Sequence, residues 1–171
     1  MHSLNEFRLG KSPDKVSIIE TRKEAFNAIL ELTKQSSRKL NIISKDLEPS
    51  IYNQSDFLEA LKNLALNGRR AQVRILVSDV ESILNVDHKI LYLSSKLSSF
   101  IELRKISPEY KKFNKAIFIA DEVGYLYREN ANLYEGKINF NSLRESKNLL
   151  GIFQEIWEAA LIDRNLRRIH I

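Results

Sequence analysis

Hydrophobic and polar positions along the chain follow two periods that alternate from one segment to the next. Runs of β-branched and other apolar residues, typical of buried strands, lie at 39–44, 72–77, 100–105, 114–120 and 124–129. Apolar residues recur at helical spacing in the segments 21–39, 55–67, 80–99 and 142–162. This order predicts an α/β fold in which a mixed, partly parallel sheet is flanked by helices on both faces.

Local signals mark where several of these elements begin and end. Thr21 and Glu24 form a capping-box pattern at the start of the first helix, and Asn67–Gly68 ends the second. Asp46, Pro49 and Asn53 predict a loop after the first strand of the domain. These signals divide the sequence into separate secondary-structure elements and do not indicate one long helix or a repeat.

The chain is expected to form one domain with a short polar arm before it. Residues 1–20 are mixed and polar, so we expect an N-terminal arm over 1–20 and a single domain over 21–171. The helical segment 80–99 is predicted in one or two pieces. Residues 166–171, LRRIHI, are predicted to add a final strand.

The last two predicted strands form a hairpin that carries two cations among apolar neighbours. With Asp121 to Gly124 as the turn, the strands pair Lys115 with Asn130, Ile117 with Arg128 and Ile119 with Leu126. Side chains alternate along a strand, so Lys115, Arg128 and Asn130 are expected to converge on one face and to form an anion pocket. The alternative is that the cations pair with protein carboxylates such as Asp121 or Glu129, or extend to water.

Composition narrows the classes of function only slightly. The 171 residues include no cysteine, which excludes disulfides, a thiolate zinc site and a thiol nucleophile. A net charge of +5 favours anionic partners such as phosphate, nucleic acid or acidic lipid, although proteins that bind none of these carry similar charges. No apolar run reaches the roughly 18–20 residues of a membrane span. The N-terminus also lacks the apolar stretch of a signal peptide, so we expect no membrane span and a cytoplasmic location.

Basic residues gather in several short clusters with tyrosines among them. The clusters are Arg69–Arg70, Arg104–Lys105, Lys111–Lys112 and Arg164 with Arg167–Arg168, and the tyrosines are Tyr110, Tyr125, Tyr127 and Tyr134. Nucleic-acid surfaces use this mixture, but each cluster has acidic neighbours, and a solvated surface of mixed charge is the alternative. Asp87–His88 has no second cluster with which to form a metal site, so no metal and no cofactor is expected.

The segment 38–79, RKLNIISKDLEPSIYNQSDFLEALKNLALNGRRAQVRILVSD, resembles the opening of a phospholipase D-like half-domain. That superfamily carries the motif HxKxxxxD on its active-site hairpin, followed by GSxN. On this chain the motif positions correspond to Phe113, Lys115, Ala120, Tyr127, Arg128 and Asn130, so that only Lys and Asn match. Several later segments, among them DHKILYLSSKLSSFIELRK, resemble an uncharacterised bacterial family of such HKD-degenerate domains, sometimes fused C-terminal to an acetyltransferase domain.

This resemblance implies a pseudoenzyme. Enzymes of the superfamily use one histidine as the nucleophile that takes the phosphoryl group and a second histidine to protonate the leaving group. Phe113, at the nucleophile position, has no lone pair with which to attack. His88 and His170 remain as substitutes, but a histidine on a helix or at a chain end is more often structural.

The leading hypothesis is a non-catalytic phospholipase D-like module that binds a phosphate-bearing ligand, such as nucleic acid, or a protein partner. Its candidate ligand-binding residues are Lys115, Arg128, Asn130 and His88, with no catalytic and no metal-binding residue. One alternative is a divergent phosphodiesterase or nuclease that uses His88, and the other is a purely structural appendage of an acetyltransferase-linked system. Because active relatives pair two half-domains, the resemblance also implies a homodimer, with Tyr125 and Tyr127 as contact area.

Overall fold

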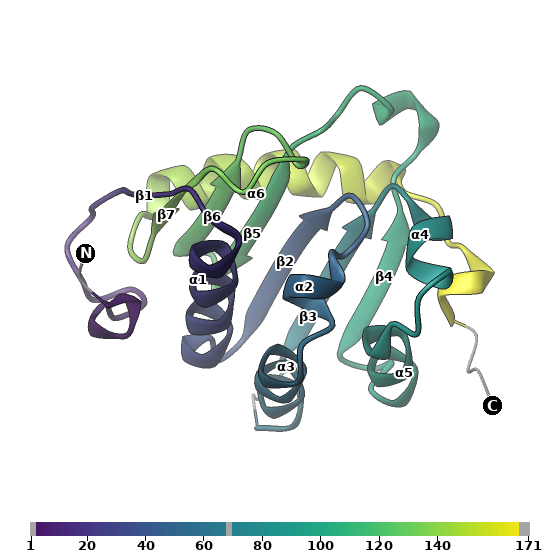
Figure 1. Cartoon of the computed structure of the whole chain (residues 1–171), viewed down its shortest axis with the longest axis horizontal. Coiled ribbons are helices and arrows are strands. Elements are labelled where there is room, and N and C mark those ends of the chain that lie inside the picture. Colours follow the sequence, from purple (N-terminus) through teal and green to yellow (C-terminus); the bar gives the residue numbers. More distant parts are fainter. Residues whose placement is uncertain (1–2, 68–69, 168–171) are drawn as a thin grey trace.

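The protein is built around one seven-stranded mixed sheet (Figure 1). The structure is a computed structural model that describes residues 3–67 and 70–167. The strands lie in the order β1-β7-β6-β5-β2-β3-β4. Their bounds are β1 (Ser17–Ile19), β2 (Lys39–Ser44), β3 (Gln72–Val77), β4 (Ile101–Lys105), β5 (Ala116–Ala120), β6 (Gly124–Arg128) and β7 (Gly136–Asn139). The predicted α/β fold with a mixed sheet is confirmed.

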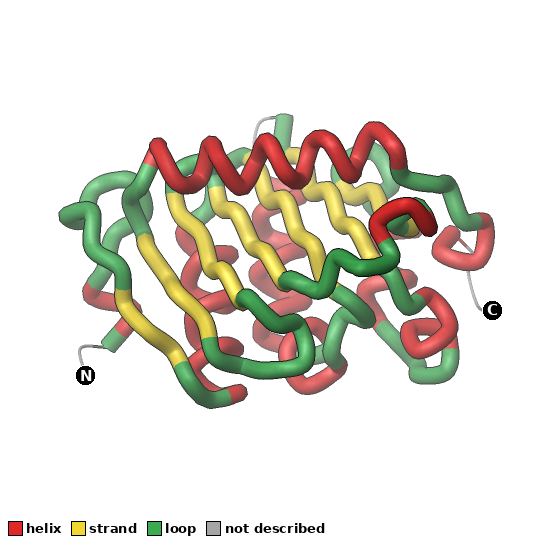
Figure 2. Tube along the Cα trace, turned by 90° about the horizontal axis from the view of Figure 1, so that it is seen from above, coloured by secondary structure: helices red, strands yellow, loops and turns green. Residues whose placement is uncertain are grey.

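Helices cover both faces of the sheet, but unequally. Helices α1, α2, α3 and α5 lie on one face, whereas α6 runs alone across the strands of the other face (Figure 2). The helices are α1 (Arg22–Gln35), α2 (Pro49–Tyr52), α3 (Ser55–Asn67), α4 (Val80–Leu84), α5 (Lys89–Lys96) and α6 (Leu143–Ala159). Short 3-10 turns occupy η1 (Leu4–Glu6), η2 (Pro108–Tyr110) and η3 (Arg164–Arg167).

The chain reverses its direction of travel across the sheet at β2. Strands β2, β3 and β4 are parallel and follow one another outward, whereas β5, β6 and β7 return on the other side of β2 as an antiparallel series. The ends of β2, β3 and β4 and the beginning of β5 therefore lie at the same edge of the sheet, here called the carboxyl edge. Ligand sites of open α/β sheets commonly lie outside such an edge, where the strand order reverses.

Two apolar cores lie between the sheet and the helices on its two faces. The larger core packs α1, α2, α3 and α5 against one face of the sheet and includes Leu32, Phe57, Ile75 and Phe118. The smaller core packs α6 against the other face. The central strands are buried on both faces, which explains why β2 and β5 read as nearly continuous apolar runs in the sequence.

Predicted and observed elements agree closely in the centre of the sheet. The predictions for 39–44 and 72–77 match β2 and β3, and the other three predicted strands differ from β4, β5 and β6 by one or two residues at an end. The helix predicted over 80–99 is divided into α4 and α5. These segments could be predicted because their apolar residues are the ones that the fold buries in the core.

The periphery departs from the predictions. Residues 17–19 of the predicted arm form β1, which pairs with the unpredicted strand β7, and the predicted loop contains the single turn of α2. Strands of three and four residues are too short to show a period, so only their pairing identifies them. The final strand predicted over 166–171 is wrong for Leu166 and Arg167, which belong to η3, and 168–171 lie outside the described residues. The division between arm and domain at residue 20 stays a prediction.

Candidate functional site

The hairpin β5–β6 has a register one residue away from the predicted one. Ala116 pairs with Arg128, Phe118 with Leu126 and Ala120 with Gly124, so the predicted pairing of Ile117 with Arg128 is wrong. A one-residue shift in register transfers a whole strand to the other face of the sheet. Arg128 therefore shares its face with Ala116, and Lys115, one residue before Ala116, lies on the opposite face. The predicted convergence of Lys115 and Arg128 does not occur.

The turn of the hairpin explains the error. Asp121 and Glu122 adopt left-handed backbone angles, with φ of 50° and 59°, and Gly124 already pairs with Ala120. The loop is thus three residues long, not four. The sequence suggested Gly124 as a turn residue, but a Cβ at this position would lie 2.4 Å from Leu9 Cδ1. Leu32 Cδ2 and the Asn139 carbonyl oxygen would also lie 3.3 Å from this Cβ, so close packing, rather than the turn, favours a glycine here.

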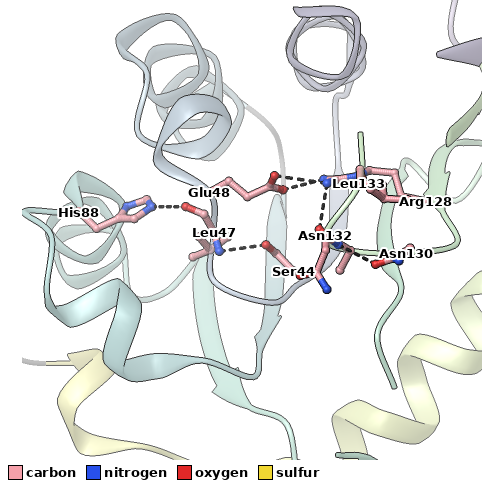
Figure 3. Close-up of polar contacts among 9 residues, drawn as sticks. Ser44, Leu47, Glu48, His88, Arg128, Asn130, Asn132 and Leu133 are labelled. Atoms are coloured by element: carbon pink, nitrogen blue, oxygen red, sulfur yellow. Dashed lines mark hydrogen bonds and ion pairs between the residues drawn. The ribbon is translucent and has the colours of Figure 1, made fainter. Parts of the chain in front are cut away.

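Arg128 is a buried cation whose charge is matched by Glu48 (Figure 3). Its side chain is 3% exposed. Its Nη1 and Nη2 donate to the two carboxylate oxygens of Glu48 at 2.6 and 3.3 Å. Its Nε and Nη2 also donate to the carbonyl oxygens of Leu133 and Ala131 at 2.8 and 3.0 Å. The guanidinium therefore joins β6, the loop after it and the segment after β2 at the carboxyl edge.

Lys115 has a separate carboxylate partner on the other face of the hairpin. Its Nζ forms an ion pair with Glu129 and lies 5.7 Å from the centre of the Tyr127 ring. The Tyr127 hydroxyl also donates to Glu129. These hydrogen bonds raise the pKa of Lys115 and lower the pKa of Glu129. Both cations thus follow the alternative raised by the sequence, although only Glu129 had been named as a partner and Glu48 had not.

Asn130 and His88 lie on different sides of the Arg128–Glu48 pair. Asn130 Oδ1 accepts hydrogen bonds from Asn114 Nδ2 at 3.1 Å and from the backbone N–H of Asn132 at 2.9 Å. His88 is on the far side of the segment that carries Leu47 and Glu48, as Figure 3 shows. The four candidate residues therefore surround the carboxyl edge without forming one cluster.

His88 is a buried, neutral capping residue. It is 4% exposed, and its Nε2 lies 2.8 Å from the Leu47 carbonyl oxygen, to which a neutral ring donates. Its Nδ1 accepts the backbone N–H of Ile90 at 3.3 Å and caps the start of α5. Burial lowers the pKa of His88, and the bond to Leu47 only partly opposes this effect. Both ring nitrogens are engaged, which leaves neither free to attack a substrate.

Asp121 has a structural role that the alignment with HxKxxxxD did not reveal, because that alignment places Ala120 at the aspartate position. Its carboxylate accepts the backbone N–H groups of Ser37, Arg38 and Lys39 at 2.8, 2.9 and 2.8 Å and so fixes the start of β2 to the hairpin turn. If Asp121 is taken as the aspartate of HxKxxxxD, the histidine position becomes Asn114 and the lysine position Ala116. Neither this frame nor the original one places a histidine at the first position.

A groove rich in lysine lies beside the start of β5. It has a volume of about 640 Å³ and is lined by Glu109, Tyr110, Lys111, Lys112, Phe113, Asn114, Lys115 and Glu129. This set is called the lysine groove below. Lys111 and Lys112 are exposed, and within 3–67 and 70–167 neither has an ion-pair partner. The sequence had marked this pair as one of several basic clusters without distinguishing it from the others.

The described residues contain no evident metal centre. Within them, no three His, Asp or Glu side chains come together closely enough to hold a metal ion. The described helices also include none with the length and apolarity needed to cross a bilayer.

Three solved structures show the same fold at low sequence identity. TrmBL2, an archaeal chromatin protein whose structure is described as showing a novel mode of DNA binding, has a TM-score of 0.64 at 17% identity and covers 88% of this chain. Nuc from Salmonella typhimurium, a phospholipase D family member, has a TM-score of 0.61 at 16% identity, with 85% of this chain and 95% of that chain covered. Phosphatidylserine synthase from Haemophilus influenzae Rd KW20 has a TM-score of 0.60 at 11% identity and covers 98% of this chain.

These likenesses establish a phospholipase D-like fold. The chain spans 54% of TrmBL2 and 42% of the phosphatidylserine synthase, so it corresponds to about half of each. No curated protein matches the sequence as a relative. A family model described as a domain of unknown function (DUF7931) matches residues 21–169. The chain therefore belongs to the DUF7931 family, whose fold in this member is that of the phospholipase D-like proteins.

Proposed function

We propose that this domain is a non-catalytic phospholipase D-like module that binds the phosphate backbone of DNA at the carboxyl edge of its sheet. The observation that carries the proposal is the lysine groove, where Lys111 and Lys112 are exposed and pair with no carboxylate of the described residues. Unpaired lysines at a surface attract phosphate groups and release counterions when these bind. The neighbour TrmBL2, whose structure is described as showing a novel mode of DNA binding, supports DNA as the ligand.

The side chains at the carboxyl edge favour binding over hydrolysis. A covalent mechanism needs an accessible nucleophile, and Phe113 and Asn114 supply none in either motif frame. His88 is buried and has both nitrogens engaged. Arg128, which a ligand would otherwise meet, is held by Glu48. Within 3–67 and 70–167, the edge therefore offers cations and amides suited to holding phosphate and no free histidine to attack it.

The earlier candidates receive different roles under this proposal. Lys115 borders the lysine groove, and Asn130 lies beside it through its bond to Asn114, so both can contact a phosphate. Arg128 can bind a ligand only by leaving Glu48, and His88 only by uncapping α5. Lys111 and Lys112 therefore carry most of the expected affinity.

Fluorescence anisotropy with a labelled single-stranded oligonucleotide tests the binding. We expect affinity at low ionic strength that falls as salt is raised, because each phosphate contact releases a counterion. The double variant Lys111→Glu/Lys112→Glu is expected to weaken binding by about tenfold or more. The matched control Lys23→Glu/Lys62→Glu reverses two exposed lysines on α1 and α3 and is expected to bind like the unaltered protein. Equal losses in the two variants, or no binding by the unaltered protein, would contradict the proposal.

Hydrolysis is tested separately with bis-p-nitrophenyl phosphate and single-stranded DNA in the absence of metal. We expect no turnover, because neither Phe113 nor Asn114 can act as the nucleophile and His88 is buried with both nitrogens engaged. Turnover that survives repurification and is lost in a His88→Ala variant would instead identify a divergent phosphodiesterase. This result would leave the binding measurement standing and would overturn only the non-catalytic part of the proposal.

A further inference from the structure

A second polar pocket lies at the edge of the sheet opposite the carboxyl edge. It has a volume of about 460 Å³ and is formed where β3 and β4 begin, between the loop after α5 and the turn η3. Its polar lining includes Gln72, Arg74, Ser98, Ser99, Glu102 and Arg167. The lysine groove shares none of these residues. The volume lies within the range of small-molecule sites, which is roughly 300–1,000 Å³.

Arg74 is the unusual member of this lining, because it is a half-buried cation without a carboxylate partner. Its Nε donates to Asn41 Oδ1 and its Nη1 to Gln154 Oε1, both at 2.9 Å and both neutral amides. Its guanidinium carbon lies 4.9 and 5.2 Å from the ring centres of Phe153 and Trp157. Among the described residues, no carboxylate lies within ion-pair distance of it, and its Nη2 has no hydrogen-bond partner.

The neighbouring carboxylates compensate Arg74 only in part. Glu102, its partner on β4, forms its ion pairs with Arg104 at 3.3 Å and Arg167 at 3.9 Å. Burial, followed by the proximity of Arg104, lowers the pKa of Arg74, while Glu122 and Glu102 oppose this effect. A half-buried cation without its own ion-pair partner is stabilised further when an anion joins it. Arg128 shows the contrast, because there the same problem is solved by Glu48 within the protein.

Two further donors of the lining are free for a ligand. The exposed hydroxyls of Ser98 and Ser99 make no hydrogen bond within the described chain. Together with Arg74 Nη2, these hydroxyls can donate to an acceptor-rich ligand.

We propose that this pocket binds the phosphate monoester of a small hydroxyl-bearing molecule, a nucleoside monophosphate or a sugar phosphate. Arg74 and Arg167 supply the positive charge, and Arg74 Nη2, which makes no hydrogen bond within the described residues, is the donor to a phosphate oxygen. The hydroxyls of Ser98 and Ser99 donate to the same group, and Gln72 and Glu102 bind the hydroxyls of the carrier. The site is separate from the DNA-binding edge and does not depend on it.

Calorimetric titration and thermal unfolding test the pocket with four probes: AMP, ribose 5-phosphate, inorganic phosphate and adenosine. We expect a phosphate ester to bind and to raise the melting temperature as its concentration rises, whereas adenosine does not. AMP and ribose 5-phosphate of equal affinity identify a sugar phosphate site, and a clear preference for AMP identifies a nucleotide site. No rise with any phosphate at ~10 mM would overturn the proposal, since even millimolar affinity is visible there.

Two variants locate the binding. Arg74→Lys keeps the charge but loses the planar fork, and we expect the dissociation constant for the bound ester to rise about tenfold. Ser99→Glu places a negative charge on an exposed loop, where folding tolerates it, and is expected to abolish binding. Lys62→Glu on α3 and the double variant of Lys111 and Lys112 are expected to bind like the unaltered protein. Unchanged binding by Ser99→Glu would overturn the proposal even if Arg74→Lys failed to fold.

Discussion

At the scale of single residues, the charge available to a ligand at the carboxyl edge depends on how Arg128 is neutralised. The sequence shows that Arg128 stands among apolar residues and so needs a partner, but it does not show which of 22 acidic residues supplies it. Glu48 lies 80 positions away and reaches Arg128 because the segment after β2 and the end of β6 lie at the same carboxyl edge. The sequence therefore predicted that Arg128 needs an anionic partner. It did not identify that partner as Glu48, because the face of the sheet on which Arg128 lies depends on the register set by the three-residue turn.

Glu48→Gln tests the buried ion pair. The change keeps the shape of the side chain but leaves the Arg128 guanidinium buried without a negative charge. We expect the free energy of unfolding in urea to fall by about 3 kcal/mol, since removing one partner of a buried pair leaves an uncompensated charge. The control is Glu129→Gln at the exposed pair with Lys115, where a much smaller change is expected. Equal effects of the two substitutions would show that burial of Arg128 does not make its pair special.

At the scale of elements, prediction succeeded where a segment is long enough for its apolar pattern to show. Strands β2 and β3 are nearly continuous apolar runs and helix α3 has one apolar face, and all three were predicted at their observed bounds. Strands β1 and β7 were missed because three or four residues hold no readable period, and they exist only through their pairing with each other and with β6. The division between α4 and α5 is marked by capping groups at the start of α5, where the His88 ring accepts the Ile90 N–H and Asn53 Oδ1 accepts the Lys89 N–H.

The cap of α5 should make stability depend on pH. The folded protein lowers the pKa of His88 below the ordinary 6.5, so the unfolded chain binds its proton more readily. The stability contributed by the neutral ring is complete above pH 6.5 and is lost as the pH falls below this value, towards the lowered folded-state pKa. Urea unfolding between pH 7.5 and 5 should therefore show a loss of stability that is reduced in His88→Gln. His2 and His170 are present in both proteins, so parallel slopes would exclude His88 as the source.

At the scale of the whole molecule, the arrangement of the helices on the two faces of the sheet determines which surfaces are left for a partner protein. The homodimer inferred from the family stays a prediction, but its proposed contact needs correction, because Tyr125 is 4% exposed and packs in the core beneath α6. Near the hairpin, the large apolar side chains that stay exposed are Ile18 and Leu133, each 52% exposed. They line a pocket of about 430 Å³ beside β7.

Homodimerisation is expected to bury this apolar region on both copies, since a twofold interface uses the same surface twice. Light scattering at ~100 μM should give twice the 19.9 kDa mass of one chain, because even weak dimers form at this concentration. Leu133→Glu should return the monomer mass, and Leu143→Glu, at an exposed position on α6, should leave the dimer intact. A monomer mass for the unaltered protein at this concentration would contradict the prediction.

The pairing of Ala116 with Arg128 also constrains the order in which this chain could change over evolutionary time. Introducing a lysine at Ala116 would place a second cation directly across from Arg128, where Glu48 balances only one charge. Substituting Arg128 first would leave Glu48 without its cation. Each single change is therefore unfavourable before the other has occurred. Positions 116 and 128 are coupled in this way, so a lysine at 116 becomes acceptable only in a chain that has already replaced both members of the ion pair.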